Sequence, residues 1–199
     1  MPLSSLSKIC LAAILALLLC ANAYSQSPKI SEGWLHQLTE LRDFEAKRIS
    51  SYDTTGKNAD AVPIDPGKTY TLAQINGPGA ISHLWCTIWA EPFYSRKLIL
   101  RIYWDGETEP SVEAPIGDFF GVGHGVDRNY SSLPFNVSSL GRARNCFFEM
   151  QFAKSARITV TNEGSQRVGA FYYYVDYRVY EKLAENTPYF HAQYRQEMP

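Results

Sequence analysis

LILRIYW, residues 98–104, followed directly by Asp105-Gly106, is the stretch that decides the fold class. Aromatic and β-branched residues fit the pleated, half-buried surface of a sheet. An Asp-Gly pair after such a run is typical of a turn that ends a strand. The stretch therefore predicts a strand, and runs of the same kind recur from residue 69 onward.

The rest of the chain predicts more strands and further turns. Asn76-Gly77-Pro78-Gly79 and Asn162-Glu163-Gly164 are turn signals between apolar runs. The predicted strands are 70–75, 81–90, 97–104, 111–114, 144–152, 156–161 and 169–180. Several antiparallel strands of this length usually close as two sheets. We therefore expect an all-β fold, an antiparallel jelly-roll β-sandwich at residues 67–199.

The N-terminus predicts an export signal at residues 1–23. Lys8 precedes an apolar run, residues 9–19, that is short for a bilayer span, and Ala21-Asn22-Ala23 offers a cleavage site. We expect a secreted or periplasmic protein with no stable membrane span after cleavage. An uncleaved anchor and a lipidated Cys20 are alternatives, although Leu19 stands where lipidation favours a small residue.

Residues 24–66 are expected to form one amphipathic helix and a polar loop. Apolar residues recur there every three or four positions, with polar residues between them. They are Trp34, Leu35, Leu38, Leu41, Phe44 and Ile49.

Charge and motifs exclude several classes of function. The formal net charge is -1, with 19 basic and 20 acidic residues and no basic stripe, so nucleic acid is not an expected partner. Gly121-Val122-Gly123 lacks the third glycine and the helix of a dinucleotide loop. No Cys or His spacing typical of a metal site occurs, and we expect neither a metal nor a cofactor. Cys86 and Cys146 are expected to be buried free thiols, with a disulfide as the alternative.

Three groups of residues are candidates for ligand binding. Asp118 and His124 lie in a glycine-rich loop, which could equally be a flexible connection with a capping carboxylate. Arg48 and Asp53 begin a polar segment, residues 48–65, whose acidic residues favour Asx-turns over a calcium site because the EF-hand order is absent.

The third group is aromatic. Trp85 and Trp104 could stack on a sugar or pack in the core, and the run Phe171 to Tyr174 is expected to be a strand with alternate rings buried.

The chain contains five long motifs: RISSYDTTGKNADAVPIDPGKTYTL (48–72), INGPGAISHLW (75–85), LRIYWDGETEPSVEAPIGDFFGVGHG (100–125), GRARNCFFEMQFAKSARITVTNEG (141–164) and FYYYVDYR (171–178). Together these motifs resemble the N-terminal half of one known family, glycoside hydrolase family 172. The resemblance implies two tandem jelly rolls, a homotrimer or homohexamer, and hydrolysis of α-linked D-fructofuranosides or D-arabinofuranosides with retention.

The resemblance also implies that the two catalytic glutamates belong to a second jelly roll. No Glu in this sequence matches their motifs, so we assign no catalytic residue and expect the chain to be truncated and inactive alone. Arg48, Asp53, Asp118, His124, Trp85 and Trp104 are then expected to contact the furanoside. The alternatives are a stand-alone carbohydrate-binding jelly roll and a structural or assembly module.

Overall fold

LILRIYW forms strand β5 (Leu98–Trp104), in which buried and half-buried side chains alternate along the whole strand. This alternation places one side of β5 against the core and the other toward solvent. The computed structural model describes residues 41–197. Within them, β5 lies at the centre of one of two sheets that form a β-sandwich.

Sheet A contains eight strands. Its main path runs through β1 (Glu45–Ser50), β12 (Val168–Val179), β4 (Gly79–Trp89), β9 (Ala143–Cys146), β8 (Phe135–Ser138) and β7 (Tyr130–Ser131). Strand β10 (Met150–Phe152) pairs with β4, and β2 (Val62–Ile64) pairs with β12. All these pairs are antiparallel.

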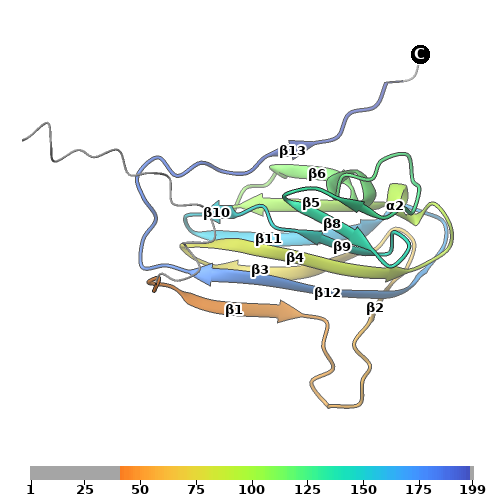
Figure 1. The fold of residues 1–199 in the computed structure, drawn as a ribbon, viewed down its shortest axis with the longest axis horizontal. Helices are drawn as coiled ribbons and strands as arrows, with labels where there is room; N and C mark the ends of the chain where they lie inside the picture. Colours follow the sequence, from red (N-terminus) through yellow and green to blue (C-terminus); the bar gives the residue numbers. More distant parts are fainter. Residues whose placement is uncertain (1–40, 198–199) are drawn as a thin grey trace, which may run out of the picture. The chain divides into compact units, whose positions relative to one another are not determined.

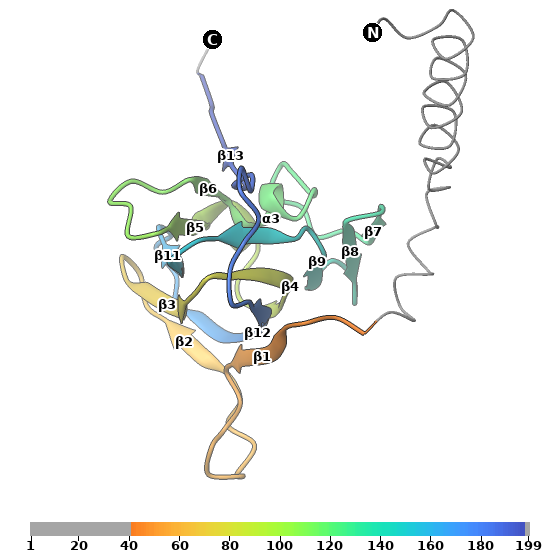
Figure 2. The same ribbon diagram turned by 90° about the vertical axis from the view of Figure 1, so that its left-hand side faces the viewer.

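Sheet B contains five strands. Their order is β13 (Ala192–Gln193), β6 (Val112–Pro115), β5, β11 (Ser155–Asn162) and β3 (Thr69–Asn76). Only the short pair of β13 with β6 is parallel among the described strands. Figures 1 and 2 show the two layers and the loop between β1 and β2, which projects from them.

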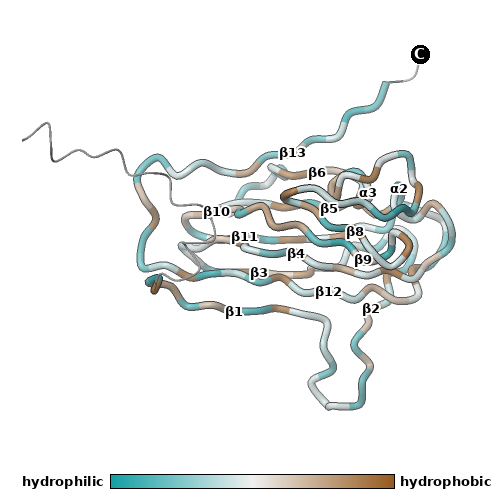
Figure 3. The backbone as a smooth tube through the Cα atoms, viewed as in Figure 1, coloured by the Kyte–Doolittle hydropathy of each residue, from teal (hydrophilic) through white to brown (hydrophobic). Residues whose placement is uncertain are grey.

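The core fills the space between the sheets. Its largest fully buried aromatic side chains are Trp104, Phe120, Phe152 and Phe171. Trp104 and Phe152 stack with ring planes 2° apart. Figure 3 shows hydrophobic and hydrophilic residues alternating along the strands, whereas the residues after β13 are mainly hydrophilic.

The predicted β-sandwich is confirmed, and each predicted strand range contains a strand. The range 144–152 is divided into β9 and β10 by three exposed residues that belong to neither strand, Phe147, Phe148 and Glu149. Two helices of four residues, α2 (Tyr94–Lys97) and α3 (Ile116–Phe119), were not expected.

The predicted helix is wrong over its last part. Residues 45–50 form β1, with Ile49 opposite Val175 of β12, and Phe44 directly precedes the strand. Pairing with β12 satisfies the backbone there, and such tertiary context overrides a local helical period. Strands β1 and β2 thus extend the sandwich ahead of residue 67. The signal peptide predicted at residues 1–23, and residues 24–40 of the predicted helix, lie outside the described residues.

Among residues 41–197, no helix has the length and apolar character needed to cross a membrane.

Candidate functional site

The outer face of sheet A carries a polar cluster that joins three strands. Arg48 on β1 lies directly opposite Asp176 on β12. Its Nε and Nη2 atoms donate to the two carboxylate oxygens of Asp176 at 2.5 and 2.9 Å. Nδ1 of His83 on β4 lies 3.2 Å from Oδ2 of the same carboxylate. Asp176 therefore joins β1, β12 and β4 through side chains as well as through the backbone.

The cluster continues across the sheet to β9. Nε2 of His83 lies 3.1 Å from Oδ1 of Asn145, whose Nδ2 atom donates to the carbonyl of Asn136 at 3.1 Å. The ring of Phe147 stacks on His83 with centroids 4.5 Å apart. The imidazole is thus fixed at both nitrogens and on one face.

Asp176 is an ionised carboxylate in this setting. Partial burial raises its pKa, but hydrogen bonds from Arg48 and His83 outweigh the burial and hold the pKa below its usual range. Asp176 therefore serves as an acceptor and a counter-ion, and it cannot supply a proton near neutral pH.

Aromatic rings lie beside the polar cluster. Trp85 on β4 stacks on Tyr174 of β12 with centroids 4.6 Å apart, and the guanidinium of Arg48 lies 4.2 Å from the centroid of Tyr174. We call Arg48, His83, Trp85, Asn145, Tyr174 and Asp176 the sheet A site. Planar polar groups beside aromatic rings are suited to binding sugar hydroxyls and the apolar face of a sugar ring.

Asp53 organises the loop after β1. Its carboxylate accepts hydrogen bonds from the backbone and hydroxyl of Thr55 and from the backbones of Lys57 and Ala59, at 2.7 to 3.1 Å. Oδ1 of Asp60 in turn accepts from the backbone of Asp53 at 2.7 Å. The hydrogen bonds from Thr55 lower the pKa of Asp53 most. The expected Asx-turn is confirmed at Asp53.

Asp118 lies in α3, which packs on β5 and β6 of sheet B and not on the sheet A site. Its carboxylate accepts hydrogen bonds from Nη1 of Arg96 at 3.0 and 3.2 Å. Arg96 also donates to the hydroxyl of Tyr194 and to Gln196 in the C-terminal segment. Asp118 is therefore part of a contact that holds that segment. His124 is exposed in the loop after α3, with a left-handed backbone at φ 63.

Trp104 lies in the core and not in the candidate site, because 0% of its surface is exposed. Its Nε1 atom donates to the carbonyl of Phe190 at 2.8 Å. The core interpretation therefore replaces sugar contact for this residue. Of the six residues predicted to contact substrate, the structure brings Arg48 and Trp85 together and places the others elsewhere.

Sequence reasoning missed four members of the sheet A site: His83, Asn145, Tyr174 and Asp176. Tyr174 and Asp176 are two positions apart on β12, so strand alternation alone places them on one face. Their contact with Arg48 depends on the pairing of β1 with β12. The residues of β1 were predicted to be part of a helix, so this pairing was not expected.

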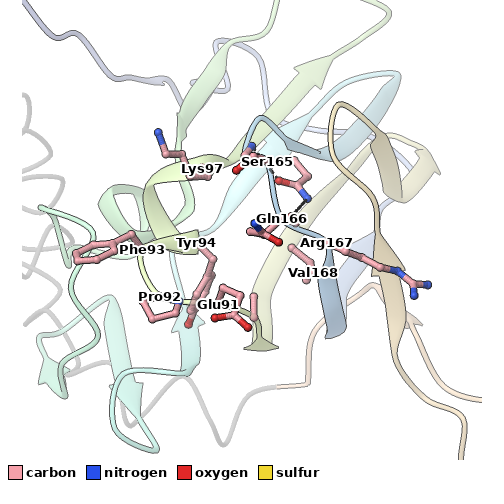
Figure 4. A pocket seen from close by; sticks show the side chains of 12 residues that line it. Glu91, Pro92, Phe93, Tyr94, Lys97, Ser165, Gln166, Arg167 and Val168 are labelled. Carbon is pink, nitrogen blue, oxygen red and sulfur yellow. Dashed lines mark hydrogen bonds between the residues drawn. The ribbon is translucent and has the colours of Figure 1, made fainter.

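A separate hollow of about 250 Å³ lies between the turn after β4 and residues 164–168. Figure 4 shows Glu91 of the turn and Tyr94 of α2 near Gln166 of the loop and Val168 at the start of β12. The loop is held by Asn162, whose Nδ2 atom donates to the carbonyl of Gln166 at 2.9 Å.

Cys86 and Cys146 are buried free thiols, as predicted. Burial raises the pKa of each thiol to about 12. Both therefore stay protonated and unreactive at neutral pH.

Comparison with protein-family models matched the GH172 first beta-sandwich domain over residues 42–197. The chain belongs to glycoside hydrolase family GH172. The match begins beside β1 and spans both sheets. The GH172 domain therefore includes residues 42–66, which we expected to precede the jelly roll. A search of curated proteins gave no match. The sheet A site is therefore a feature of a GH172 first β-sandwich.

Proposed function

We propose that this GH172 chain is the N-terminal part of a secreted or periplasmic enzyme that hydrolyses α-linked D-fructofuranosides or D-arabinofuranosides with retention. The sheet A site carries the proposal, because it combines fixed hydrogen-bonding groups with aromatic rings on one face of the domain. Its role is to hold the furanose ring, with Arg48 and Asn145 presenting polar groups to hydroxyls and Trp85 contacting the ring. The assembly is proposed to be a homotrimer or a homohexamer.

The described carboxylates of the candidate residues are suited to positioning and not to the reaction. Retention requires a carboxylate nucleophile and a protonated carboxyl group about 5 to 5.5 Å apart. Asp176 and Asp118 are each paired with an arginine, and Asp53 accepts four hydrogen bonds within its own loop. A carboxylate with such partners is a weak nucleophile and a poor proton donor.

The chemistry is therefore assigned to two glutamates of a second β-sandwich. One carboxylate attacks the anomeric carbon while the other protonates the leaving oxygen, and water then releases the sugar. On this proposal the 199-residue chain has no hydrolytic activity by itself.

Hydrolysis of 4-nitrophenyl α-D-arabinofuranoside tests the proposal. The chain alone should give no turnover above the blank, and a fusion to the second β-sandwich of an active GH172 enzyme should give turnover. Arg48→Met in the fusion should raise KM with little loss of kcat, because it removes a binding contact. Turnover by the chain alone would show that the reactive carboxylates lie within it. A fusion that cleaves pyranosides and not furanosides would overturn the substrate class.

A further inference from the structure

A second hollow, of about 350 Å³, lies on the other side of the turn after β4. Phe93, Val126, Asp127 and Arg142 are among its lining residues. The hollow is large enough for one sugar ring. Phe93 lines both hollows, and Figure 4 shows its ring directed away from Gln166 and Val168 of the first hollow.

Phe93 is held in a conformation that its side chain does not favour. Its φ is 65°, in the left-handed region, and 66% of its surface is exposed. A bulky residue with positive φ costs free energy, and burial of this ring does not offset the cost. Such strain occurs often at binding sites. The ring stands as an open apolar platform at the edge of the hollow.

Asp127 supplies a fixed carboxylate to the same hollow. Its Oδ1 atom accepts hydrogen bonds from Nη2 of Arg144 at 3.0 Å and from the hydroxyl of Tyr94 at 3.2 Å. Arg144 is fully buried, so its charge compensates that of Asp127. Within residues 41–197, Oδ2 of Asp127 has no hydrogen-bond partner. That oxygen is available to a ligand hydroxyl in a preorganised position.

Arg142 adds a free cation. Its side chain is exposed, and its guanidinium makes no hydrogen bond or ion pair in the described part of the chain. The charges of Asp127 and Arg144 cancel each other, so the charge of Arg142 leaves the hollow with one net positive charge. A guanidinium binds a carboxylate through two parallel hydrogen bonds. The charge and geometry therefore favour a ligand with one carboxylate.

We propose that this hollow binds a uronic acid residue of a glycan. The sugar ring packs on Phe93, its hydroxyls donate to Oδ2 of Asp127, and its carboxylate pairs with Arg142. This site lies apart from the sheet A site, and it does not depend on furanoside hydrolysis. The proposal gives the GH172 domain a means of holding an acidic polysaccharide.

Titration of the full chain with methyl β-D-glucuronide and methyl β-D-glucoside, followed by NMR, tests the proposal. The two probes differ only at C6, where one carries a carboxylate. We expect the glucuronide to bind about fivefold more tightly at low salt, as for an exposed ion pair. Arg142→Met should abolish that preference, and its melting temperature should not change because the side chain has no partner to lose.

Phe93→Gly separates binding from folding. Glycine tolerates positive φ, so this variant should melt at the same or a higher temperature, yet lose affinity for both probes. Leu133→Ala is the control, because Leu133 is 92% exposed and does not line the hollow. No saturable binding of the glucuronide, equal affinity for the two probes, or unchanged binding in both hollow variants would each overturn the proposal.

Discussion

Arg48 and Asp176 form a two-bond ion pair between adjacent strands, with Nε to Oδ1 at 2.5 Å and Nη2 to Oδ2 at 2.9 Å. The pair lies at an edge of sheet A, where β1 has β12 as its partner. The same contact therefore orders the sheet A site and helps to fix an edge strand. Because the Arg48 side chain is partly exposed, the pair stabilises the fold by about 1 kcal/mol or less.

Acid should weaken the fold through Asp176. Its pKa is lower in the folded chain than in the unfolded chain, where it is about 3.9. The stabilisation is therefore complete above about pH 5 and is lost as the pH falls through the folded pKa. Melting temperatures from pH 7 to pH 2 should fall less steeply for Asp176→Asn than for the wild type. Identical slopes would show that Asp176 is not linked to folding.

Trp85 and Trp104, both predicted to contact the substrate, should differ in the stability that each loses on substitution by alanine. Trp104→Ala removes a fully buried ring and should lower the free energy of unfolding by about 3 to 5 kcal/mol. Trp85→Ala removes a half-buried ring on the outer face of sheet A and should cost about 1 kcal/mol. Urea unfolding measures both values. Equal costs would contradict the division between core and site.

Asp127 should be needed to stabilise the buried positive charge of Arg144. Asp127→Ala leaves a fully buried guanidinium without its counter-ion and should cost about 2 kcal/mol or more. Arg144→Met together with Asp127→Ala removes both charges and should recover much of that loss. A double-mutant cycle by urea unfolding tests this coupling, and strictly additive costs would show that the two side chains act independently.

Gly141 should tolerate no side chain. Its φ is 90°, and a Cβ there would lie 2.2 Å from the backbone nitrogen of Arg128. Gly141→Ala should therefore cost about 2 kcal/mol or more, because backbone must move. Gly56→Ala is the matched control: φ is 72° but no atom lies within 4 Å, so only the conformational cost of about 1 kcal/mol applies. Thermal melting compares them, and equal losses would mean that the loop at Arg128 moves freely.

The fold could be predicted where an alternation of apolar residues is followed by a sequence typical of a turn. β5 and β11 show apolar residues at every second position and end at Asp105-Gly106 or Asn162-Glu163-Gly164. β1 could not be predicted this way, because its residues EAKRIS are mostly exposed and its order comes from pairing with β12. Strands as short as β7 and β13 carry too few residues to show a period.

Only part of the candidate site could be predicted, because its contacts also depend on strand pairing. Trp85 was predicted as an aromatic residue that could stack on a sugar, and Arg48 was predicted from the family resemblance. The register that joins Arg48 to Asp176 spans 128 positions in the chain, so neither the contact nor the site follows from local sequence. Trp104 has the same chemistry as Trp85, and only the strand face separates them. Burial of that face is a property of the packed sandwich and is not encoded in the residue type.

The most direct test of the sheet A site follows the indole NH signals of Trp85 and Trp104 by NMR while methyl α-D-arabinofuranoside is added. Trp85 lies in the proposed site, whereas the NH of Trp104 is buried and bonded to Phe190. We expect the Trp85 signal to move saturably, the Trp104 signal to stay fixed, and Arg48→Met to weaken the response. If the Trp85 signal does not move at any concentration of the furanoside, the sheet A site does not bind the sugar.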